Sequence, residues 1–426
     1  MHAADHASLL LRAWLLASRV AHPLARRHIR RRLARGKEDP DRYPEKFGIP
    51  SAPRPPGTLV WMHAVGVGEI LALPGLVRKM QERVPSLQVL LTSTARTSAD
   101  AIAPNMPPDT RHQFLPVDCM RFVRGFLDHW RPDLSVWAER DIWPAIVVEA
   151  HRRDIPLALV NGRMDSVSFS AKRKVRALYS DLYRRFALIG AQDPESADRF
   201  EALGAPADRL FVSGSLKAGA SPLADRPEER RHLKAALSDR RVWLAASTHA
   251  ADEEVVADAH LRVLRGDPTT CLAIAPRDPV RANVLVAYLE SRSLACEVIR
   301  DGVAPSAQAQ VLVIDRIGQL GLWYRLADRA FIGGTMGDIG GHNPYEPARL
   351  GCAIIHGPDV SNFSADYSAF HRADAVRLVT SAEELADAVM DPDLASVAGK
   401  VEPVLKRGEA VLDQAAARLL WLLRTD

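Results

Sequence analysis

Short apolar runs alternate with longer segments of helical periodicity along most of this chain. In the first half the apolar runs fall at residues 58–65, 88–91, 134–138, 157–160 and 187–191. The alternation resumes in the second half at residues 242–246, 271–275, 311–314, 329–332 and 353–356, and a helical segment follows near residues 403–423. Apolar strands separated by helices are typical of a parallel sheet covered on both faces. The pattern therefore predicts an α/β fold.

Residues 218–239 interrupt this alternation, because they are rich in Ala, Pro, Arg and Glu and have no strand signal. A chain of 426 residues is long enough for two domains, each with its own core. We therefore predict two Rossmann-like domains with parallel sheets facing a central cleft. The first spans residues 41–220, and the second, with a C-terminal helix, spans residues 239–426. Residues 221–238 are predicted to be a linker, and residues 1–40 an N-terminal arm.

The arm carries an unusual charge. Residues 6–37 contain nine Lys and Arg residues and no acid, whereas the formal net charge of the whole chain is only +4. The apolar stretch at residues 9–20 is too short and too charged to span a bilayer, and its charges follow it, unlike those of a signal peptide. We predict that residues 1–37 form an interfacial helix on an anionic membrane surface; the alternative is an ordinary surface helix. Nucleic acid is not expected as a partner.

The prolines after the arm, and the cysteines and histidines of the whole chain, give two further predictions. The prolines of residues 39–57 predict a stiff connector that isolates the arm from the folded body. The four cysteines form no pairing pattern, which indicates a reducing compartment, and the 14 histidines show no ligand spacing. We therefore expect no metal and no cofactor.

The stretch at residues 333–352 reads GGTMGDIGGHNPYEPARLGC and lies between two apolar runs. This predicts a strand, a glycine-rich turn and the start of a helix, where Asn343 is a suitable cap. Gly340 and Gly341 would let the backbone approach a phosphate, and His342 and Glu346 would share a helix face. Glu346 could bind ribose hydroxyls, or it could simply form a capping pair with Asn343. The spacing matches neither GxGxxG nor a P-loop.

Acidic and basic residues follow strands of the first half. Glu69, in HAVGVGE, opens a helix and could accept a proton from an attacking hydroxyl, or it could complement the helix dipole. Glu139 and Asp141 could orient a polar acceptor or pair with neighbouring arginines. Arg163 is expected to face the same region, and Lys217 could meet an anion there or be solvated.

Residues suited to phosphate follow strands of the second half. Ser247 and Thr248 offer hydroxyls and backbone N–H groups. Arg277 has a planar fork that binds phosphate or carboxylate through two hydrogen bonds. Gly318, with the following Gln319, could bound a nucleotide pocket.

Together these motifs resemble those of the 3-deoxy-D-manno-octulosonic acid (Kdo) transferases. GVGE, ERDIWP, NGRM, GSLK, ASTH, PRD, DRIGQL and GGHNPYEP occur in the order expected for that family. The resemblance implies a GT-B fold and an inverting, metal-independent transfer of Kdo from CMP-Kdo to a lipid A precursor or related lipid acceptor. It also implies a peripheral or monotopic enzyme at the cytoplasmic face of the inner membrane.

The resemblance implies a role for each matched residue. Glu69 would be the catalytic base. The donor site would include Arg277, Gly340, Gly341, His342, Asn343 and Glu346. The other assignments rest on positions after strands and not on the resemblance: Ser247, Thr248 and Gly318 are predicted to contact the donor, and Glu139, Asp141, Arg163 and Lys217 the acceptor.

The sequence departs from the family pattern mainly on the acceptor side. Gly66 replaces a serine, Asp141 a glutamate, and Ala145 an asparagine, so we expect an altered acceptor preference. Asp278 and Gln319 also depart from the usual PRH and GEL motifs. Two other interpretations stay open: a GT-B transferase or epimerase that uses another sugar nucleotide, and a non-catalytic paralogue.

Overall fold

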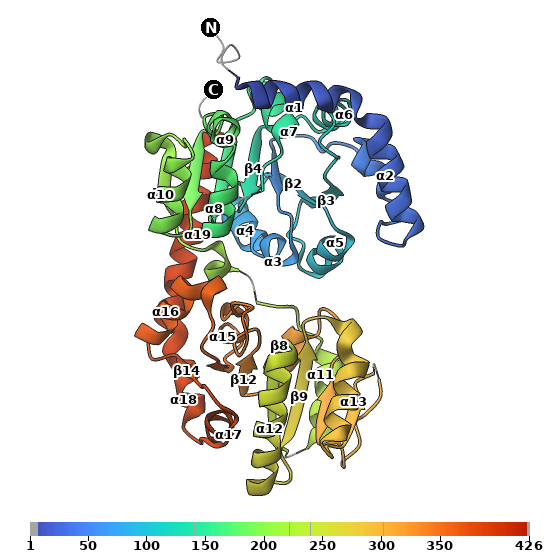
Figure 1. The fold of residues 1–426 in the computed structure, drawn as a ribbon, viewed down its shortest axis with the longest axis vertical. Coiled ribbons are helices and arrows are strands. Elements are labelled where there is room, and N and C mark those ends of the chain that lie inside the picture. The colour runs from blue at the N-terminus through green and yellow to red at the C-terminus, as the bar shows by residue number, and fades with distance from the viewer. Residues whose placement is uncertain (1–6, 140, 221, 239, 301, 424–426) are drawn as a thin grey trace. The chain divides into compact units, whose positions relative to one another are not determined.

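The computed structural model describes residues 7–139, 141–220, 222–238, 240–300 and 302–423. The chain divides into two units (Figure 1). The first comprises residues 1–221 together with residues 408–426, and the second comprises residues 222–407. Each unit is built on its own parallel sheet.

The first sheet has seven parallel strands in the order β3-β2-β1-β4-β5-β6-β7. The strand order reverses between β1 and β4, and such a switch point is where open α/β sheets bind ligands. The strands are β1 (Leu59–His63), β2 (Gln88–Ser93), β3 (Thr110–Phe114), β4 (Leu134–Ala138), β5 (Leu157–Gly162), β6 (Leu188–Ala191) and β7 (Leu210–Val212).

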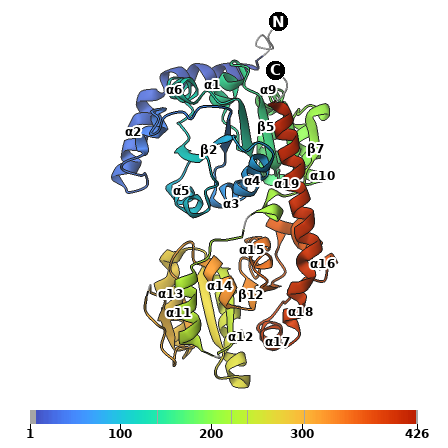
Figure 2. The same ribbon diagram turned by 180° about the vertical axis from the view of Figure 1, so that it is seen from behind.

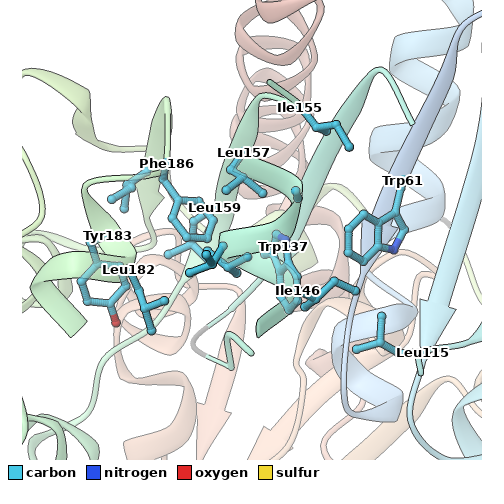
Figure 3. Packing of buried hydrophobic residues seen from close by; sticks show 14 of the residues in the cluster. Trp61, Leu115, Trp137, Ile146, Ile155, Leu157, Leu159, Leu182, Tyr183 and Phe186 are labelled. Carbon is cyan, nitrogen blue, oxygen red and sulfur yellow. The ribbon is translucent and has the colours of Figure 1, made fainter. Parts of the chain in front are cut away.

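Helices cover both faces of this sheet, as alternate side chains of β1 show. Leu59 and Trp61 belong to one buried cluster, and Val60 and Met62 to another. Because successive side chains of a strand point to opposite faces, the two clusters lie on opposite sides of the sheet. In the first cluster the rings of Trp61 and Trp137 pack edge to face with centroids 5.5 Å apart (Figure 3).

The helices of the first unit are α1 (Leu9–Val20), α2 (His22–Ala34), α3 (Val67–Ile70), α4 (Leu73–Arg83), α5 (Arg96–Ile102), α6 (Met120–Trp130), α7 (Pro144–His151), α8 (Ser166–Arg173), α9 (Arg176–Tyr183) and α10 (Pro194–Ala202). Short 3-10 helices are η2 (Tyr43–Phe47), η3 (Ala103–Asn105), η4 (Ala207–Arg209) and η5 (Leu216–Gly219).

The expectation of an isolated arm is wrong, because α1 packs against α6, α7 and α9. Leu11 is fully buried in the first cluster, and the indole nitrogen of Trp14 bonds to Asp118. The connector is also folded: it contains η2, where the buried Glu45 accepts from the backbone N–H of Phe114 and pairs with Arg42. No helix among the described residues is both long and apolar enough to span a bilayer.

The second sheet also has seven parallel strands, in the order β10-β11-β9-β8-β12-β13-β14, with its switch point between β8 and β12. The strands are β8 (Val242–Thr248), β9 (Cys271–Pro276), β10 (Cys296–Val298), β11 (Val311–Val313), β12 (Arg329–Ile332), β13 (Ala353–His356) and β14 (Val376–Leu378).

The helices of the second unit are α11 (Pro227–Leu237), α12 (Ala250–Gly266), α13 (Ala282–Ser291), α14 (Leu320–Leu326), α15 (Tyr345–Ala348), α16 (Ser364–Arg372), α17 (Ala382–Met390) and α18 (Leu394–Ala398). Short 3-10 helices are η6 (Pro279–Arg281), η7 (Ser361–Phe363) and η8 (Gly399–Val401).

Two predicted boundaries need correction. The expected linker at residues 221–238 contains α11, because Leu233 and Leu237, four residues apart, form a buried stripe. The C-terminal helix α19 (Glu402–Leu422) does not belong wholly to the second unit, since residues 408–426 cluster with the first. Figure 2 shows this helix in red. Leu412, Ala416 and Leu419 complete the second buried cluster of the first sheet.

Candidate active site

Two carboxylates meet at the switch point of the first sheet. Glu69 lies in α3, directly after β1, and Glu139 directly follows β4, the neighbour of β1. One Glu69 oxygen, Oε2, accepts from the backbone N–H groups of Val65 at 3.0 Å and Gly66 at 2.9 Å. These bonds fix the carboxyl group and leave its other oxygen for other partners. Glu69 is thus an acid at the start of a helix, as one of the two interpretations expected. Its surroundings also change the pKa of its carboxyl group.

The environment of Glu69 favours its protonated form. Burial, and then the charge of Glu139, raise the pKa of the Glu69 carboxyl above its ordinary value, and a hydrogen bond between the two side chains acts in the same direction. The two backbone bonds oppose this shift. A carboxyl whose pKa is raised toward neutrality is a better proton acceptor than an exposed glutamate. The arrangement therefore suits a general base.

Glu139 is held by a cation and an amide. Lys217 Nζ lies 3.0 Å from Glu139 Oε1, and Asn161 Nδ2 donates to the same oxygen at 3.4 Å. Asn161 Oδ1 in turn accepts from the backbone N–H of Leu216 at 2.9 Å, so it also fixes the loop that carries Lys217. Glu139 and Asn161 both have positive φ, 65° and 56°. Such backbone strain costs about 1–3 kcal/mol per residue and is concentrated at functional sites.

The other predicted acceptor residues are placed differently. Asp141 is exposed. Burial is the main cause that raises the pKa values of Tyr179 and Tyr183 in α9, and the charge of Asp141 adds to the shift. Arg163 is half-buried just after β5. The side chain of Ala145 is fully buried, so the idea that this position faces an acceptor is wrong. Arg140 lies outside the described residues.

In the second unit, the turns after β8 and β12 meet at the switch point. Ser247 has a φ of 57°, and the pairing register with β9 shifts there. A Cβ on Gly333 would lie 2.5 Å from the carbonyl oxygen of Ser247, so only glycine allows this approach. The hydroxyl of Thr248 does not face outward as expected. It is buried and lies 3.5 Å from Glu253 Oε1.

Two histidines bridge these turns. The Nε2 atoms of His249 and His342 are 2.9 Å apart, and the rings stack with an interplanar angle of 11°. Burial, then the charges of His249 and Arg277, lower the pKa of His342 to about 4. His342 is therefore neutral at pH 7. Arg277 directly follows β9, and its backbone N–H bonds to the Thr248 carbonyl oxygen at 2.9 Å.

The glycine-rich stretch leads into α15 as the sequence predicts. Gly340 and Gly341 have φ values of 92° and 76°. Asn343 Oδ1 accepts from the backbone N–H of Tyr345, the first residue of α15, at 3.1 Å, and Asn343 Nδ2 donates to Glu346 Oε1 at 3.3 Å. Asn343 and Glu346 are thus bonded to each other at the start of α15, and both the capping box and the ribose contact of Glu346 stay predictions.

Gly318 lies in an exposed turn after β11, with a φ of 85°. The next side chain, Gln319, is almost fully buried, and neither amide atom has a hydrogen-bond partner within the described protein. Among the described residues, no three His, Cys, Asp or Glu side chains are placed to hold one metal ion.

Sequence reasoning missed Asp252 of α12. Its carboxylate accepts from the backbone N–H groups of His249, Gly334, Thr335 and Met336. A local signal existed, because an acid three residues after a helix-starting residue is typical of a capping box. The sequence gives no sign of the bonds to the distant glycine-rich turn.

Several known proteins are similar to this chain over most of its length. A family model described as 3-deoxy-D-manno-octulosonic-acid transferase (kdotransferase) matches residues 41–220. The probable mitochondrial 3-deoxy-D-manno-octulosonic acid transferase of Arabidopsis thaliana is 34% identical over 377 residues, which cover 86% of this chain and 84% of that protein. The 3-deoxy-D-manno-octulosonic acid transferase of Haemophilus influenzae is 29% identical over 89% of both chains.

A solved structure supports the architecture. UDP-GlcNAc 2-epimerase from Neisseria meningitidis, bound to UDP-GlcNAc, covers 85% of this chain and 100% of its own with a TM-score of 0.58. Its identity of 13% restricts this likeness to the fold. The predicted GT-B class is confirmed by this likeness and by the two parallel sheets. Given the extent and identity of its relatives, the chain belongs to the Kdo transferase family and is a glycosyltransferase.

Proposed function

We propose that this enzyme transfers Kdo from CMP-Kdo to a lipid A precursor or a related lipid, with inversion and without a metal. It would act as a peripheral or monotopic protein at the cytoplasmic face of the inner membrane. The observation that carries the proposal is the carboxylate pair of Glu69 and Glu139 beside Lys217, at the switch point of the first sheet.

Glu69 would accept the proton of the acceptor hydroxyl while that oxygen attacks the anomeric carbon of Kdo. The bond from this carbon to the phosphate oxygen breaks, and CMP leaves with the electron pair. A single displacement of this kind inverts the anomeric configuration. The negative charge of Glu139 makes Glu69 a stronger base, and the ion pair with Lys217 holds the Glu139 carboxylate beside it.

The second unit offers groups for the departing phosphate. Arg277 supplies a permanent charge, and a neutral imidazole of the His249–His342 pair can donate a hydrogen bond. Preorganised donors of this kind stabilise charge that develops in the transition state. They support the proposal that CMP departs without a metal ion.

The surface of α1 and α2 supports binding to a membrane. Leu9, Leu16, Val20 and Leu24 are exposed, and so is about half of the Trp14 side chain. Beside them, four arginines of α2 line an open hollow: Arg26, Arg27, Arg30 and Arg31. Exposed apolar side chains next to clustered arginines are typical of helices that lie in an interface with anionic headgroups.

A transfer assay tests the chemistry. Full-length protein is incubated with CMP-Kdo, a lipid A precursor and EDTA, and the anomeric configuration of the product is read by NMR. Glu69→Gln should lower kcat by about 10²–10⁴-fold, the range of general base catalysis. Glu82→Gln, at an exposed acid of α4, is the matched control. Normal turnover by Glu69→Gln, a retained configuration, or loss of activity in EDTA would each contradict a part of the proposal.

Donor binding has its own test. Arg277→Ala should weaken CMP binding by about 1.5–3 kcal/mol, the usual range for hydrogen bonds to charged groups. Arg265→Ala, at an exposed arginine of α12, controls for the change in net charge. The same calorimetry is repeated with UDP-GlcNAc. If the protein binds UDP-GlcNAc and does not bind CMP, the alternative that the enzyme uses another sugar nucleotide is favoured.

A further inference from the structure

Asp252 makes more hydrogen bonds than a helix cap requires. Asp252 is almost fully buried, with 1% of its surface exposed. Oδ2 accepts from the backbone N–H of His249 at 2.8 Å and of Gly334 at 2.6 Å. Oδ1 accepts from the backbone N–H of Met336 at 3.0 Å and of Thr335 at 3.2 Å. Only the bond to His249 belongs to the cap of α12. The other three join α12 to the turn after β12, more than eighty residues along the chain.

These bonds fix the backbone on both sides of the histidine pair. His249 is held directly through its own N–H. His342 is held through Gly334, because the Gly334 carbonyl oxygen accepts from the N–H of Gly341 at 2.7 Å. The imidazole of His342 also lies against Gly334, where an added Cβ would come within 3.1 Å of His342 Cδ2. One carboxylate thus helps to fix the backbone that carries both rings.

The carboxylate cannot itself contact a ligand while these bonds exist. An ionised carboxylate has about four lone-pair sites, and four backbone N–H groups occupy them. Its charge is also spread over those four donors, which reduces its repulsion of a nearby anion. Any effect of Asp252 on donor binding must therefore act through the two turns.

We propose that Asp252 is a positioning residue of the donor site, which holds the turns after β8 and β12 together so that His249 and His342 form a preorganised pair for the donor phosphate. The inference rests on the proposed function, because it takes CMP as the ligand. A positioning role differs from a purely structural one in that it changes ligand affinity and ring geometry as well as stability.

The experiment compares Asp252→Asn with Asp258→Asn in the full chain. Asp258 is a half-exposed acid on the same helix, paired with Arg292, and serves as the control. Asparagine keeps the shape of Asp252 but replaces one acceptor oxygen with a donor, which would face backbone N–H groups. Three quantities are measured: CMP affinity by calorimetry, the pKa of His342 by NMR, and Tm.

In Asp252→Asn we expect CMP affinity to fall about tenfold or more, and the pKa of His342 to rise from about 4 toward the ordinary value near 6.5 as the rings separate. The control should change neither quantity. A fall in Tm with CMP affinity and the His342 pKa both unchanged would overturn the proposal.

If Asp252→Asn fails to fold, a second variant still tests the proposal. Asp252→Glu keeps the charge and all acceptor atoms but is longer by one methylene, so it should show smaller changes in the same direction. If this variant has wild-type affinity and a wild-type His342 pKa, the proposal is wrong. Failure of the wild-type protein to bind CMP would overturn the proposed donor instead, and the His342 titration would still decide the role of Asp252.

Discussion

Trp14 donates its indole N–H to Asp118 Oδ2 at 2.9 Å, and this bond joins the first helix of the chain to the body of the first unit. The same carboxylate accepts from the backbone N–H groups of Ala145 at 2.9 Å and Ile146 at 3.0 Å, at the start of α7. The segment that leads into α7 begins at Glu139. The arm and the start of α7 therefore share one buried carboxylate.

The first prediction concerns this bond. Trp14→Phe keeps an aromatic ring but removes the donor, so the free energy of unfolding should fall by about 1.5–3 kcal/mol, the range for a hydrogen bond to a charged group. Urea denaturation followed by circular dichroism measures it. Trp421→Phe, at an exposed tryptophan of α19, is the control. Equal stability of the two variants would show that α1 is only loosely attached. Deletion of residues 1–37 should destabilise the first unit further, rather than leave it intact.

The second prediction concerns pH. Because the pKa of Glu69 is raised, kcat/KM should rise with pH through a value above the ordinary glutamate pKa of about 4.3. Glu139→Gln removes the neighbouring charge and should shift this limb to lower pH. A pH–rate profile of both proteins checks the expectation. An unshifted limb in Glu139→Gln would mean that the two carboxylates do not interact.

Stability provides the third prediction, with a definite sign. The folded state holds the proton on Glu69 more tightly than the unfolded state does. The free energy of unfolding should therefore decrease as pH rises from the ordinary pKa of glutamate through the raised one. In Glu69→Gln this contribution disappears, so the pH dependence should become flatter. Urea midpoints of both proteins are measured across this window. A slope in Glu69→Gln that is steeper than or equal to that of the wild type would contradict the assignment.

The fourth prediction concerns the basic surface. Replacing Arg27, Arg30 and Arg31 with glutamine should weaken binding to vesicles with anionic lipids by about 1 kcal/mol per residue, since all three are exposed on α2. The residual binding should decrease with salt. Replacing the exposed Arg231 and Arg372 of the second unit is the control. Sedimentation with vesicles measures the binding. If the α2 variant binds as well as the wild-type protein, the basic surface has another role.

The fifth prediction concerns the acceptor. A Cβ on Gly66 would lie 3.4 Å from Glu69 Oε1, an ordinary contact, so Gly66→Ser should fold normally. The added hydroxyl restores the residue of the family pattern beside the proposed base. We expect the wild-type enzyme to favour a modified lipid acceptor and Gly66→Ser to gain activity on the standard precursor. Parallel kinetics on both acceptors test this, and a wild-type preference for the standard precursor would refute it.

The sequence pattern predicts the central strands well and the edges poorly. The strands β1, β4 and β12 are buried along their whole length, β8 is buried except at Ser247, and all four contain apolar runs in the sequence. The edge strand β3 reads TRHQF, and β14 at the edge of the second sheet is largely exposed. Such strands lack the uninterrupted apolar run that identifies a buried parallel strand.

The candidate site shows a similar division. Glu69, Glu139 and Lys217 follow strands of one sheet. The rule that ligands bind at the carboxyl ends of strands therefore predicts that all three lie at the same edge of the sheet. Asp118 and Asp252 could not be found in this way. Their partners are mainly backbone N–H groups of distant segments, and every residue except proline has such a group.

The return of α19 to the first unit has a consequence for synthesis. Gly408 lies so close to Ala218 that a Cβ there would come within 2.2 Å of its carbonyl oxygen, and Leu412 packs against Gly219. The first sheet therefore lacks part of its cover until residues 408–423 have left the ribosome, although its strands are translated before them. A fragment that ends near residue 220 would expose this apolar face, and a separate peptide of residues 408–423 should be able to complement it.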